Sequence, residues 1–324
     1  MKYLIINADD FGKSPAENQA IIDLLRQQRI SSATLMPNAP GYEEARQWCV
    51  ESKTQAVGLH LTLTSDHFST MPLETQPPHY RSLTRHKSLE DEQGFLFTQA
   101  ESLRRQAVPH ELQDEIAAQF AKLHQDGIAI SHVDCHMYSL YPACGTRMFR
   151  FLLGQCRRHG RIPLRFCRES WPIEGVRTLY ESAWVSTAYA ALADLYNVPI
   201  PDYAYAFPYF AAGIDSYDQK KQTLIAFIGK LPEGISELHL HPATDSDELR
   251  RTNPTAQHRI DEYRLLLDND IREALEKQGV ILVSYRDIRR LAQDSRASRL
   301  AKAACCLSGL VFKKLGVLVL LWQV

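Results

Sequence analysis

Short apolar runs alternate with amphipathic segments along most of the chain. The runs are rich in Ile, Val and Leu, which is typical of strands buried in a parallel sheet. They predict strands at residues 3–6, 33–36, 56–63, 128–133, 164–166, 235–240 and 280–284. The segments between the runs have apolar residues three and four positions apart, as amphipathic helices do. They predict helices at residues 16–25, 43–50, 112–124, 148–156, 220–227 and 260–275.

The alternation of strands and helices predicts a parallel sheet with helices outside it. The number of strand–helix units in one chain favours a (β/α) barrel over an open dinucleotide-binding sheet. The first strand is followed by Asp9-Asp10-Phe11-Gly12, where an open sheet of that kind would carry a GxGxxG turn for a pyrophosphate. We therefore expect an α/β barrel in a single domain.

Two long irregular insertions, residues 64–107 and 197–216, interrupt this pattern. Loops of this length in a compact domain are usually lids or walls of a binding site. The second insertion carries a run of aromatic residues, namely Tyr203, Tyr205, Phe207, Tyr209 and Phe210. They suit the flat face of a sugar, and a separate hydrophobic cluster is an equally good interpretation of them.

The composition is that of a folded protein. The 324 residues are 45% hydrophobic, and 37 Lys and Arg balance 38 Asp and Glu to a net charge of −1. These values exclude a mainly disordered chain and argue against a basic face that binds nucleic acid. Seven scattered cysteines without a CxxC motif predict reduced thiols, and the first strand reaches Asp9 after too few apolar residues for a signal peptide. We expect a cytoplasmic enzyme.

An apolar C-terminal extension, residues 294–324, follows the expected domain at residues 1–293. Lys313-Lys314 divides its apolar residues into two stretches, each too short to span a bilayer. The favoured interpretation is packing on the barrel or on a second copy of the chain, as a homodimer contact. An anchor on a membrane surface and an appended sequence unrelated to the fold are the alternatives.

Two adjacent aspartates, Asp9 and Asp10, end the first predicted strand. In a parallel barrel the C-terminal ends of the strands form the active face, so both residues are candidates for catalysis or metal binding. Capping of the helix that begins at Pro15 is the alternative, but two adjacent charges at the end of an apolar strand favour a functional role. His60 ends another strand and is expected to lie near them.

The densest polar constellation is Ser131-His132-Val133-Asp134-Cys135-His136. In an extended segment His132, Asp134 and His136 share one face, and in a helical segment the two histidines are adjacent. Two imidazoles and a carboxylate brought together need a cation or a hydrogen-bond network. We favour a metal site over a purely structural network.

Another strand ends in Glu237-Leu238-His239-Leu240-His241-Pro242, which places Glu237, His239 and His241 on one face. Arg165 is a charge inside an apolar strand and needs a carboxylate or a substrate anion as its partner. One Asp and two His leave open positions on a metal, which is the catalytic pattern. Together with a carboxylate as base and a histidine as acid, these groups describe metal-dependent hydrolysis of an amide or ester.

These motifs, in this order, resemble the YdjC-like (ChbG/HpnK) family of carbohydrate deacetylases. The similarity spans about residues 1–290 and rests on residues 4–12, 31–36, 58–64, 132–136, 237–242 and 279–288. It implies a distorted TIM-barrel-like fold. It also implies hydrolysis of N-acetyl groups from an amino sugar, such as a chitooligosaccharide or a GlcNAc-containing glycan or glycolipid.

The resemblance further implies roles for individual residues. Asp10, His60 and His136 would bind a divalent ion, Asp9 would be the general base, and His241 would be the general acid or an oxyanion stabiliser. His132, Asp134 and Arg165 are expected to contact the substrate. The ion is Mg²⁺ by resemblance, whereas two imidazoles and one carboxylate suit Zn²⁺, Mn²⁺ or Co²⁺ at least as well.

The chain departs from the family pattern at three places. Cys135 stands where Ser is usual, residues 137–140 replace a His-rich stretch, and Ala243 follows the His-Pro pair where Gly is common. These departures bear on whether the chain acts on the family's usual substrate, and they remove none of the expected metal ligands. The alternatives are a metal-dependent hydrolase of a different amide or ester, and a non-catalytic sugar-binding barrel.

Overall fold

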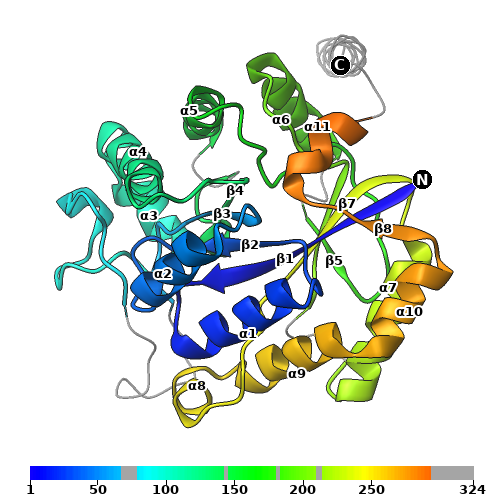
Figure 1. Cartoon of the computed structure of the whole chain (residues 1–324). Coiled ribbons are helices and arrows are strands. Elements are labelled where there is room, and N and C mark those ends of the chain that lie inside the picture. The colour runs from blue at the N-terminus through cyan, green and yellow to red at the C-terminus, as the bar shows by residue number, and fades with distance from the viewer. Residues whose placement is uncertain (67–78, 142–144, 180–182, 209–213, 293–324) are drawn as a thin grey trace, which may run out of the picture.

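The computed structural model describes residues 1–66, 79–141, 145–179, 183–208 and 214–292. A curled sheet of eight strands lies at its centre, in the order β4-β3-β2-β1-β7-β6-β5, with β8 paired to the beginning of β1 (Figure 1). Neighbouring strands are parallel except for β5 and β6. The strands are β1 (Lys2–Phe11), β2 (Ser32–Leu35), β3 (Val57–Leu61), β4 (Val133–Cys135), β5 (Arg177–Thr178), β6 (Tyr203–Ala206), β7 (Gly234–Leu240) and β8 (Val280–Leu282).

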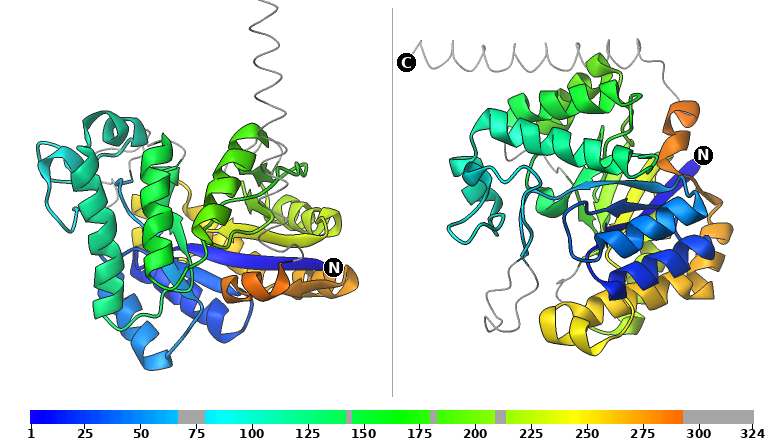
Figure 2. Two further views of the ribbon diagram at one scale, coloured as in Figure 1. Left: turned by 90° about the horizontal axis from the view of Figure 1, so that it is seen from above. Right: turned by 60° about the vertical axis from the view of Figure 1, so that its left-hand side comes forward.

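Helices surround the outer side of the curled sheet (Figure 2). The α-helices are α1 (Pro15–Arg26), α2 (Tyr42–Ser52), α3 (Ala100–Gln106), α4 (Pro109–Gln125), α5 (Gly145–Arg158), α6 (Ala183–Tyr196), α7 (Tyr217–Lys230), α8 (Asp247–Thr252), α9 (Ala256–Leu267), α10 (Asn269–Lys277) and α11 (Ile288–Leu291). The described residues also form the short 3-10 helices η2 (Lys87–Leu89), η3 (His136–Tyr138) and η4 (Tyr285–Asp287).

The two faces of the sheet carry different side chains. On β1, Leu4, Ile6 and Ala8 belong to the main hydrophobic core between the sheet and the helices. Ile5 points to the inside of the curl and belongs to a separate small apolar cluster with Ile235, Val283, Tyr285 and Ile288. This cluster fills the inside of the curl near the beginnings of the strands.

Further along the strands, the inward-facing positions are polar and buried. Asn7 and Asp9 follow on β1, and Glu237 and His239 follow on β7. The polar layer therefore lies at the C-terminal ends of the strands, above an apolar layer that supports it. This is the face on which parallel barrels build their active sites.

The expected barrel is not closed by strand pairing in the described part of the chain. Residues 163–166 span the gap between β4 and β6, and a single bridge pairs Val133 with Leu164. Pro163 accepts a hydrogen bond from β4 and Pro199 accepts one from Leu164, but a proline has no N–H to return. The strand predicted there is therefore reduced to isolated contacts. The fold is a curled half-barrel and not a closed TIM barrel.

Three other sequence predictions differ from the structure. The strand predicted at residues 128–133 begins only at Val133, as β4. The helix predicted at residues 260–275 is broken into α9 and α10 because Asp268 ends the first and caps the second by accepting a hydrogen bond from Asp270 N–H. The insertion predicted at residues 197–216 contains β6, which adds a strand to the sheet.

Two of the aromatic residues in that insertion face the core. Tyr205 and Phe207 belong to the main hydrophobic core and not to a separate hydrophobic cluster. Tyr209 and Phe210 lie outside the described residues, as does the C-terminal extension at 294–324. The expectations for that extension, including homodimer and membrane contact, stay predictions. Within the described segments, no helix is both long enough and apolar enough to cross a membrane.

Candidate metal centre

A β-bulge near the end of β1 lets two neighbouring aspartates face the interior. Ala8 pairs with Ala33 and Phe11 pairs with Leu35, so three steps along β1 match two steps along β2. The extra residue is accommodated at Asp10, whose φ of 67° is left-handed, a conformation that Asp tolerates better than most residues. A regular strand would send the two side chains to opposite faces.

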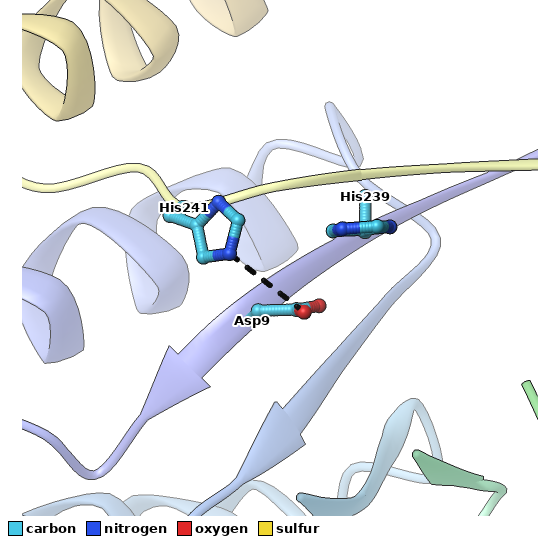
Figure 3. Close-up of side chains that lie close together, drawn as sticks. All are labelled: Asp9, His239 and His241. Carbon is cyan, nitrogen blue, oxygen red and sulfur yellow. Dashed lines mark ion pairs between the residues drawn. The ribbon is translucent and has the colours of Figure 1, made fainter. Parts of the chain in front are cut away.

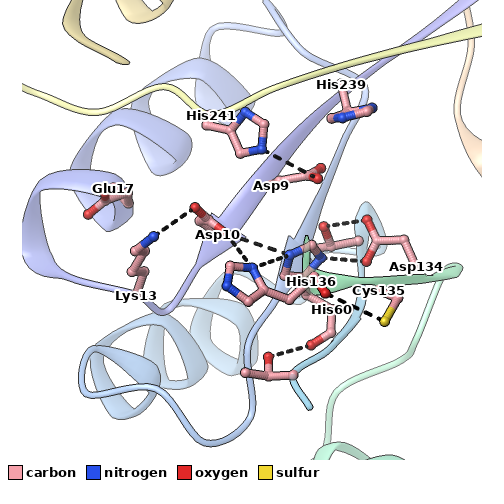
Figure 4. A network of polar contacts seen from close by, with 12 residues as sticks. Asp9, Asp10, Lys13, Glu17, His60, Asp134, Cys135, His136, His239 and His241 are labelled. Carbon is pink, nitrogen blue, oxygen red and sulfur yellow. Dashed lines mark hydrogen bonds and ion pairs between the residues drawn. The ribbon is translucent and has the colours of Figure 1, made fainter. Parts of the chain in front are cut away.

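Three ligand-type atoms meet where β1, β3 and β4 end (Figure 4). They are Oδ1 of Asp10, Nε2 of His60 and Nδ1 of His136. The oxygen lies 3.5 Å from the His60 nitrogen and 3.3 Å from the His136 nitrogen, and the two nitrogens are 3.3 Å apart. All three residues are buried. The structure thus brings the three predicted ligands together.

A carboxylate holds the other ring nitrogen of each histidine. Asp134 on β4 is hydrogen-bonded to His60 Nδ1 at 2.6 Å, and Asp66 is hydrogen-bonded to His136 Nε2 at 3.0 Å. A carboxylate only accepts hydrogen bonds, so it fixes a proton on the outer nitrogen and leaves the inner nitrogen free to bind a cation. Histidines that bind metals are usually supported in this way.

Two cations occupy the second oxygen of Asp10. Lys13 Nζ lies 3.2 Å from Oδ2, and Arg259 Nη2 lies 2.7 Å from it. Figure 4 shows Lys13 approaching Asp10 from a different side than the two imidazoles. Within the described residues, Oδ1 makes no hydrogen bond of ordinary geometry. Asp10 therefore presents one oxygen to the centre of the triad.

The charges around the triad attract a cation. Burial alone would lower the pKa of His60, but Asp134 and Asp10 outweigh burial and raise that pKa to about 10. Burial is likewise outweighed at His136, whose pKa is raised by Asp66 and Asp10. Two buried imidazoles that lie close together and both have a raised proton affinity form a favourable site for a positive charge.

The three atoms fit a divalent metal ion. An ion about 2.1 Å from each ligand places neighbouring ligands about 3.0 Å apart in octahedral geometry and about 3.4 Å apart in tetrahedral geometry. The separations of 3.3, 3.3 and 3.5 Å match the tetrahedral arrangement more closely. Three protein ligands also leave at least one coordination position open, as catalytic sites do.

A second group of one aspartate and two histidines lies beside the triad. Asp9, His239 and His241 have ligand-type atoms within 4.8 Å of one another, and Figure 3 shows both imidazoles on the same side of Asp9. His241 Nε2 is 3.9 Å from Asp9 Oδ2, and Tyr138 OH is hydrogen-bonded to His239 Nε2 at 2.7 Å. Burial lowers the pKa of His241 to about 3 and that of His239 well below its usual range. Both imidazoles are therefore neutral near pH 7.

Arg165 supplies the positive charge of this second group. Its guanidinium donates to both oxygens of Asp9 and to Glu237 Oε1, each at 2.7 Å, and lies 2.7 Å from Asp134 Oδ2. Burial would raise the pKa of Asp9, but the pairing with Arg165 outweighs it and holds that pKa far below its usual range. The partner expected for Arg165 was a carboxylate or a substrate anion, and the structure shows three carboxylates.

The three residues expected to contact substrate lie beneath the site. His132, Asp134 and Arg165 are at most 1% exposed. His132 stacks on Tyr285 with ring centroids 3.8 Å apart, and its Nε2 is hydrogen-bonded to Asn7 at 3.0 Å. Their burial leaves no surface for substrate in this conformation and favours a role in supporting the residues above them.

Several residues of the site were not predicted from the sequence. Asp66 comes from the first insertion, Lys13 from the loop after β1 and Arg259 from α9. Tyr138 follows His136 in a turn in which both Met137 and Tyr138 have positive φ. Only Asp66 had a local signal, because it lies shortly after the end of β3.

Comparisons with known proteins identify the family of this chain. The sequence pattern of the family described as YdjC-like protein matches residues 3–277. The chain is 27% identical over 290 residues to a carbohydrate deacetylase of Enterococcus faecalis, covering 89% of this chain and 98% of that protein. It is 24% identical over 295 residues to a carbohydrate deacetylase of Thermoanaerobacter pseudethanolicus, covering 88% and 98%.

A solved structure is also similar. An Enterococcus faecalis protein named for cellobiose-phosphate cleavage matches with a TM-score of 0.66 and 28% identity, covering 88% of this chain and 98% of that chain. The family match includes every strand end that contributes to the two Asp–His groups. The resemblance noted from the motifs is confirmed, and the chain belongs to the YdjC-like protein family.

Proposed function

We propose that this protein is a metal-dependent carbohydrate deacetylase that removes N-acetyl groups from an amino sugar. Relatives of nearly the same length bear the name carbohydrate deacetylase. The observation that carries the metal dependence is the triad of Asp10, His60 and His136, whose imidazoles are both held by carboxylates.

The triad would hold the ion through Asp10 Oδ1, His60 Nε2 and His136 Nδ1. When bound, a divalent ion supplies Lewis acidity, which polarises an acyl carbonyl and lowers the pKa of a water molecule. Lys13 and Arg259 would keep Asp10 monodentate, because they occupy its other oxygen. The proton transfers would then be performed by the second group.

Asp9 would accept the proton of the attacking water. Arg165 fixes both of its oxygens, so the carboxylate has one orientation, and the lowered pKa keeps it ionised at neutral pH. A carboxylate with a low pKa is a weak base that releases its proton again readily. Asp9 therefore suits a residue that carries a proton from one reactant to the next.

His241 would give a proton to the leaving amine. Its Nε2 lies 3.9 Å from Asp9 Oδ2, and its side chain is 17% exposed, more than that of Asp9. A neutral imidazole can receive the proton held by Asp9, and its lowered pKa makes the resulting imidazolium a strong acid. Glu262 on α9 accepts a hydrogen bond from the His241 backbone N–H at 2.5 Å and so fixes the end of β7.

The donor set bears on the identity of the ion. Mg²⁺ prefers oxygen ligands and octahedral geometry, whereas imidazole is a good ligand for Zn²⁺ and neighbouring transition metals. Two of the three proposed ligands are imidazoles. We expect Zn²⁺, Co²⁺ or Mn²⁺ to bind more tightly than Mg²⁺, which the family resemblance suggests.

Acetate release tests the proposal. The metal-stripped protein is incubated with N,N′-diacetylchitobiose, its phosphorylated form or a GlcNAc-lipid, after addition of Mg²⁺, Zn²⁺, Mn²⁺ or Co²⁺. We expect metal-dependent acetate release from at least one substrate and none from the His60→Ala protein. Metal binding without acetate release from any of them would overturn the assignment as an amino-sugar deacetylase and favour a hydrolase of another amide or ester.

A further inference from the structure

The two histidines of the triad are oriented from different parts of the fold. His60 is held by Asp134, which lies on the neighbouring strand β4 of the sheet. His136 is held by Asp66, which lies in the insertion that begins at residue 64. One half of the metal centre is therefore supported by the sheet and the other half by the insertion.

Both oxygens of Asp66 accept contacts from hydrogen-bond donors. Oδ1 is hydrogen-bonded to His136 Nε2 at 3.0 Å. Oδ2 accepts from Tyr80 OH at 2.7 Å and lies 2.7 Å from Lys13 Nζ. Asp66 is 4% exposed, so little water reaches these contacts. Only a side chain with hydrogen-bond acceptors at both positions, such as a carboxylate, can pair with all of these donors.

Hydrogen bonds join the described parts of the insertion to one another and to helix α4. Ser65 N–H donates to Phe97 O at 2.9 Å, and Tyr80 N–H donates to Ser65 Oγ at 2.9 Å. Buried Glu115 on α4 accepts hydrogen bonds from the backbone N–H groups of Leu83 and Thr84 at 3.1 and 2.9 Å. These contacts hold together the segments that carry Asp66 and Tyr80 and attach the nearby residues 83 and 84 to α4.

We propose that Asp66 is a positioning residue for the metal centre. Through Asp66 and Tyr80, the insertion becomes a structural part of that centre. The proposal rests on the proposed metal site and concerns how His136 is held for a divalent cation. Asp66 keeps the proton of His136 on Nε2, so that Nδ1 offers its lone pair toward Asp10 Oδ1. Tyr80 OH and Lys13 in turn keep Asp66 in its orientation.

The Asp66→Asn variant gives the sharpest test. Asparagine must turn its NH₂ group either toward His136 Nε2 or toward Tyr80 OH and Lys13, which are all donors to Asp66. In the first orientation the His136 proton moves to Nδ1, the atom that should bind the ion. In the second, two donor groups face each other in a buried place.

The experiment measures affinity for Zn²⁺ and Co²⁺ on metal-stripped protein, by competition with a chelator of known affinity. We expect Asp66→Asn to lower the affinity about 10- to 100-fold, as loss of a carboxylate behind a metal-binding histidine does. Tyr80→Phe, which keeps the ring and removes only the hydroxyl, should lower it by a smaller factor. The ligand-field absorption of the Co²⁺ protein should change with Asp66→Asn.

Glu90→Gln is the matched control. Glu90 lies in the same insertion and accepts hydrogen bonds from Ser82 N–H and Ser82 Oγ at 3.0 and 2.9 Å, away from His136. The same carboxylate-to-amide change there should leave the metal affinity and the Co²⁺ spectrum unchanged. Thermal unfolding of the metal-free variants separates a general loss of stability from an effect on the centre.

The outcomes divide clearly. A loss of affinity with Asp66→Asn and Tyr80→Phe but not with Glu90→Gln supports the proposal. If Asp66→Asn folds, unchanged affinity and an unchanged spectrum would overturn the proposal. If Asp66→Asn does not fold, unchanged affinity in Tyr80→Phe would overturn it. Equal losses in all three variants would overturn it too, because the effect would then belong to the stability of the insertion. Because the readout is metal affinity, a wild-type protein that binds the ion but releases no acetate would refute the deacetylase assignment and leave this inference standing.

Discussion

Two groups of the site, Asp10 with His60 and His136 and Asp9 with His239 and His241, have the same composition and different surroundings. In the first group, carboxylates hold the outer nitrogens of both histidines, and the pKa values of His60 and His136 are raised. In the second group, the guanidinium of Arg165 holds the aspartate, and the pKa values of His239 and His241 are lowered. The neighbours of each group, and not its own residues, decide its chemistry.

This contrast assigns a different task to each group. In the first group, Lys13 and Arg259 pair with the outer oxygen of Asp10, and Asp10 Oδ1 and the inner nitrogens of the two histidines face one point, which favours a divalent cation. In the second group, Arg165 donates to both oxygens of Asp9, so a metal there would compete with a guanidinium. The neutral histidines of this second group are better suited to carrying protons. We therefore propose the first group as the metal centre and the second as the proton-transfer site of the reaction.

The largest expected effect comes from removing a ligand. His60→Ala and His136→Ala should each lower metal affinity by more than about 100-fold, which is the upper end of the loss expected when only a carboxylate behind a ligand is removed. Both changes should abolish acetate release. His239→Ala should leave metal affinity unchanged, because the second group is not expected to bind the ion. Tyr138 is hydrogen-bonded to His239, and Arg165 pairs with both oxygens of Asp9. Equilibrium dialysis followed by measurement of bound metal compares the three variants. Metal loss in His239→Ala equal to that in His60→Ala would break the contrast.

A change at Asp9 should separate metal binding from catalysis. We expect Asp9→Asn to lower kcat by about 100- to 10,000-fold, the usual contribution of a general base, with no change in metal affinity. Arg165 keeps Glu237 and Asp134 as partners in this variant. Steady-state acetate release and metal titration on one preparation measure both quantities. Activity close to that of the wild type would show that another group accepts the proton.

Changing Asp134, which holds His60, should lower metal affinity less than removing His60 itself. Asp134 is hydrogen-bonded to His60 Nδ1 and to Thr34 OH, and pairs with Arg165. Asp134→Asn places an amide NH₂ among these donors, and we expect metal affinity to fall about 10- to 100-fold. Chelator competition measures the loss. Full wild-type affinity would mean that His60 is positioned by the sheet alone.

The pH dependence of stability should report on Glu262, which lies behind His241. Burial raises the pKa of Glu262 from 4.5 to about 8. The folded protein therefore retains a proton that the unfolded chain loses above pH 4.5, so the contribution of Glu262 to stability falls as the pH rises from 4.5 to 8. Glu262→Gln should remove this component, which is at most a few kcal/mol. Urea unfolding of metal-free protein at pH 5 and pH 8.5 measures it, and parallel changes in both proteins would contradict the shift.

The smallest effect is expected at Tyr138. Its hydroxyl is hydrogen-bonded to His239 Nε2 at 2.7 Å. Tyr138→Phe removes a hydrogen bond worth about 1 kcal/mol, which corresponds to about a fivefold decrease in kcat, with metal affinity retained. Acetate release and chelator competition test the two parts. A loss of metal with this variant would place Tyr138 with the first group.

Much of the site could be predicted because its residues end apolar strands. The runs that became β1, β3 and β7 are local patterns, and the polar residues that follow them meet at one edge of a parallel sheet. Asp10 and His60 became candidates in this way, and His136 came from the constellation at residues 131–136. The order of the motifs then identified the family, and the family resemblance combined these three as a ligand set.

The features that could not be predicted depend on distant contacts. The bulge that turns both aspartates inward is visible only in the pairing of β1 with β2. Asp66 reaches His136 through the path of an insertion that has no periodic pattern. The opening of the barrel lies at Pro163 and Pro199, which accept hydrogen bonds from Val133 and Leu164 but have no N–H to donate in return. Arg165 was recognised as a buried charge, but its three carboxylates come from three different strands.

The contrast between the two groups is tested most directly by locating the metal. A crystal of the protein soaked in Zn²⁺ or Co²⁺ is measured on both sides of the absorption edge of the ion. We predict a single anomalous peak between Asp10 Oδ1, His60 Nε2 and His136 Nδ1, with none between Asp9 and His239 or His241. A peak in the second group, alone or in addition to the first, would contradict the division of metal binding and proton transfer proposed for this protein.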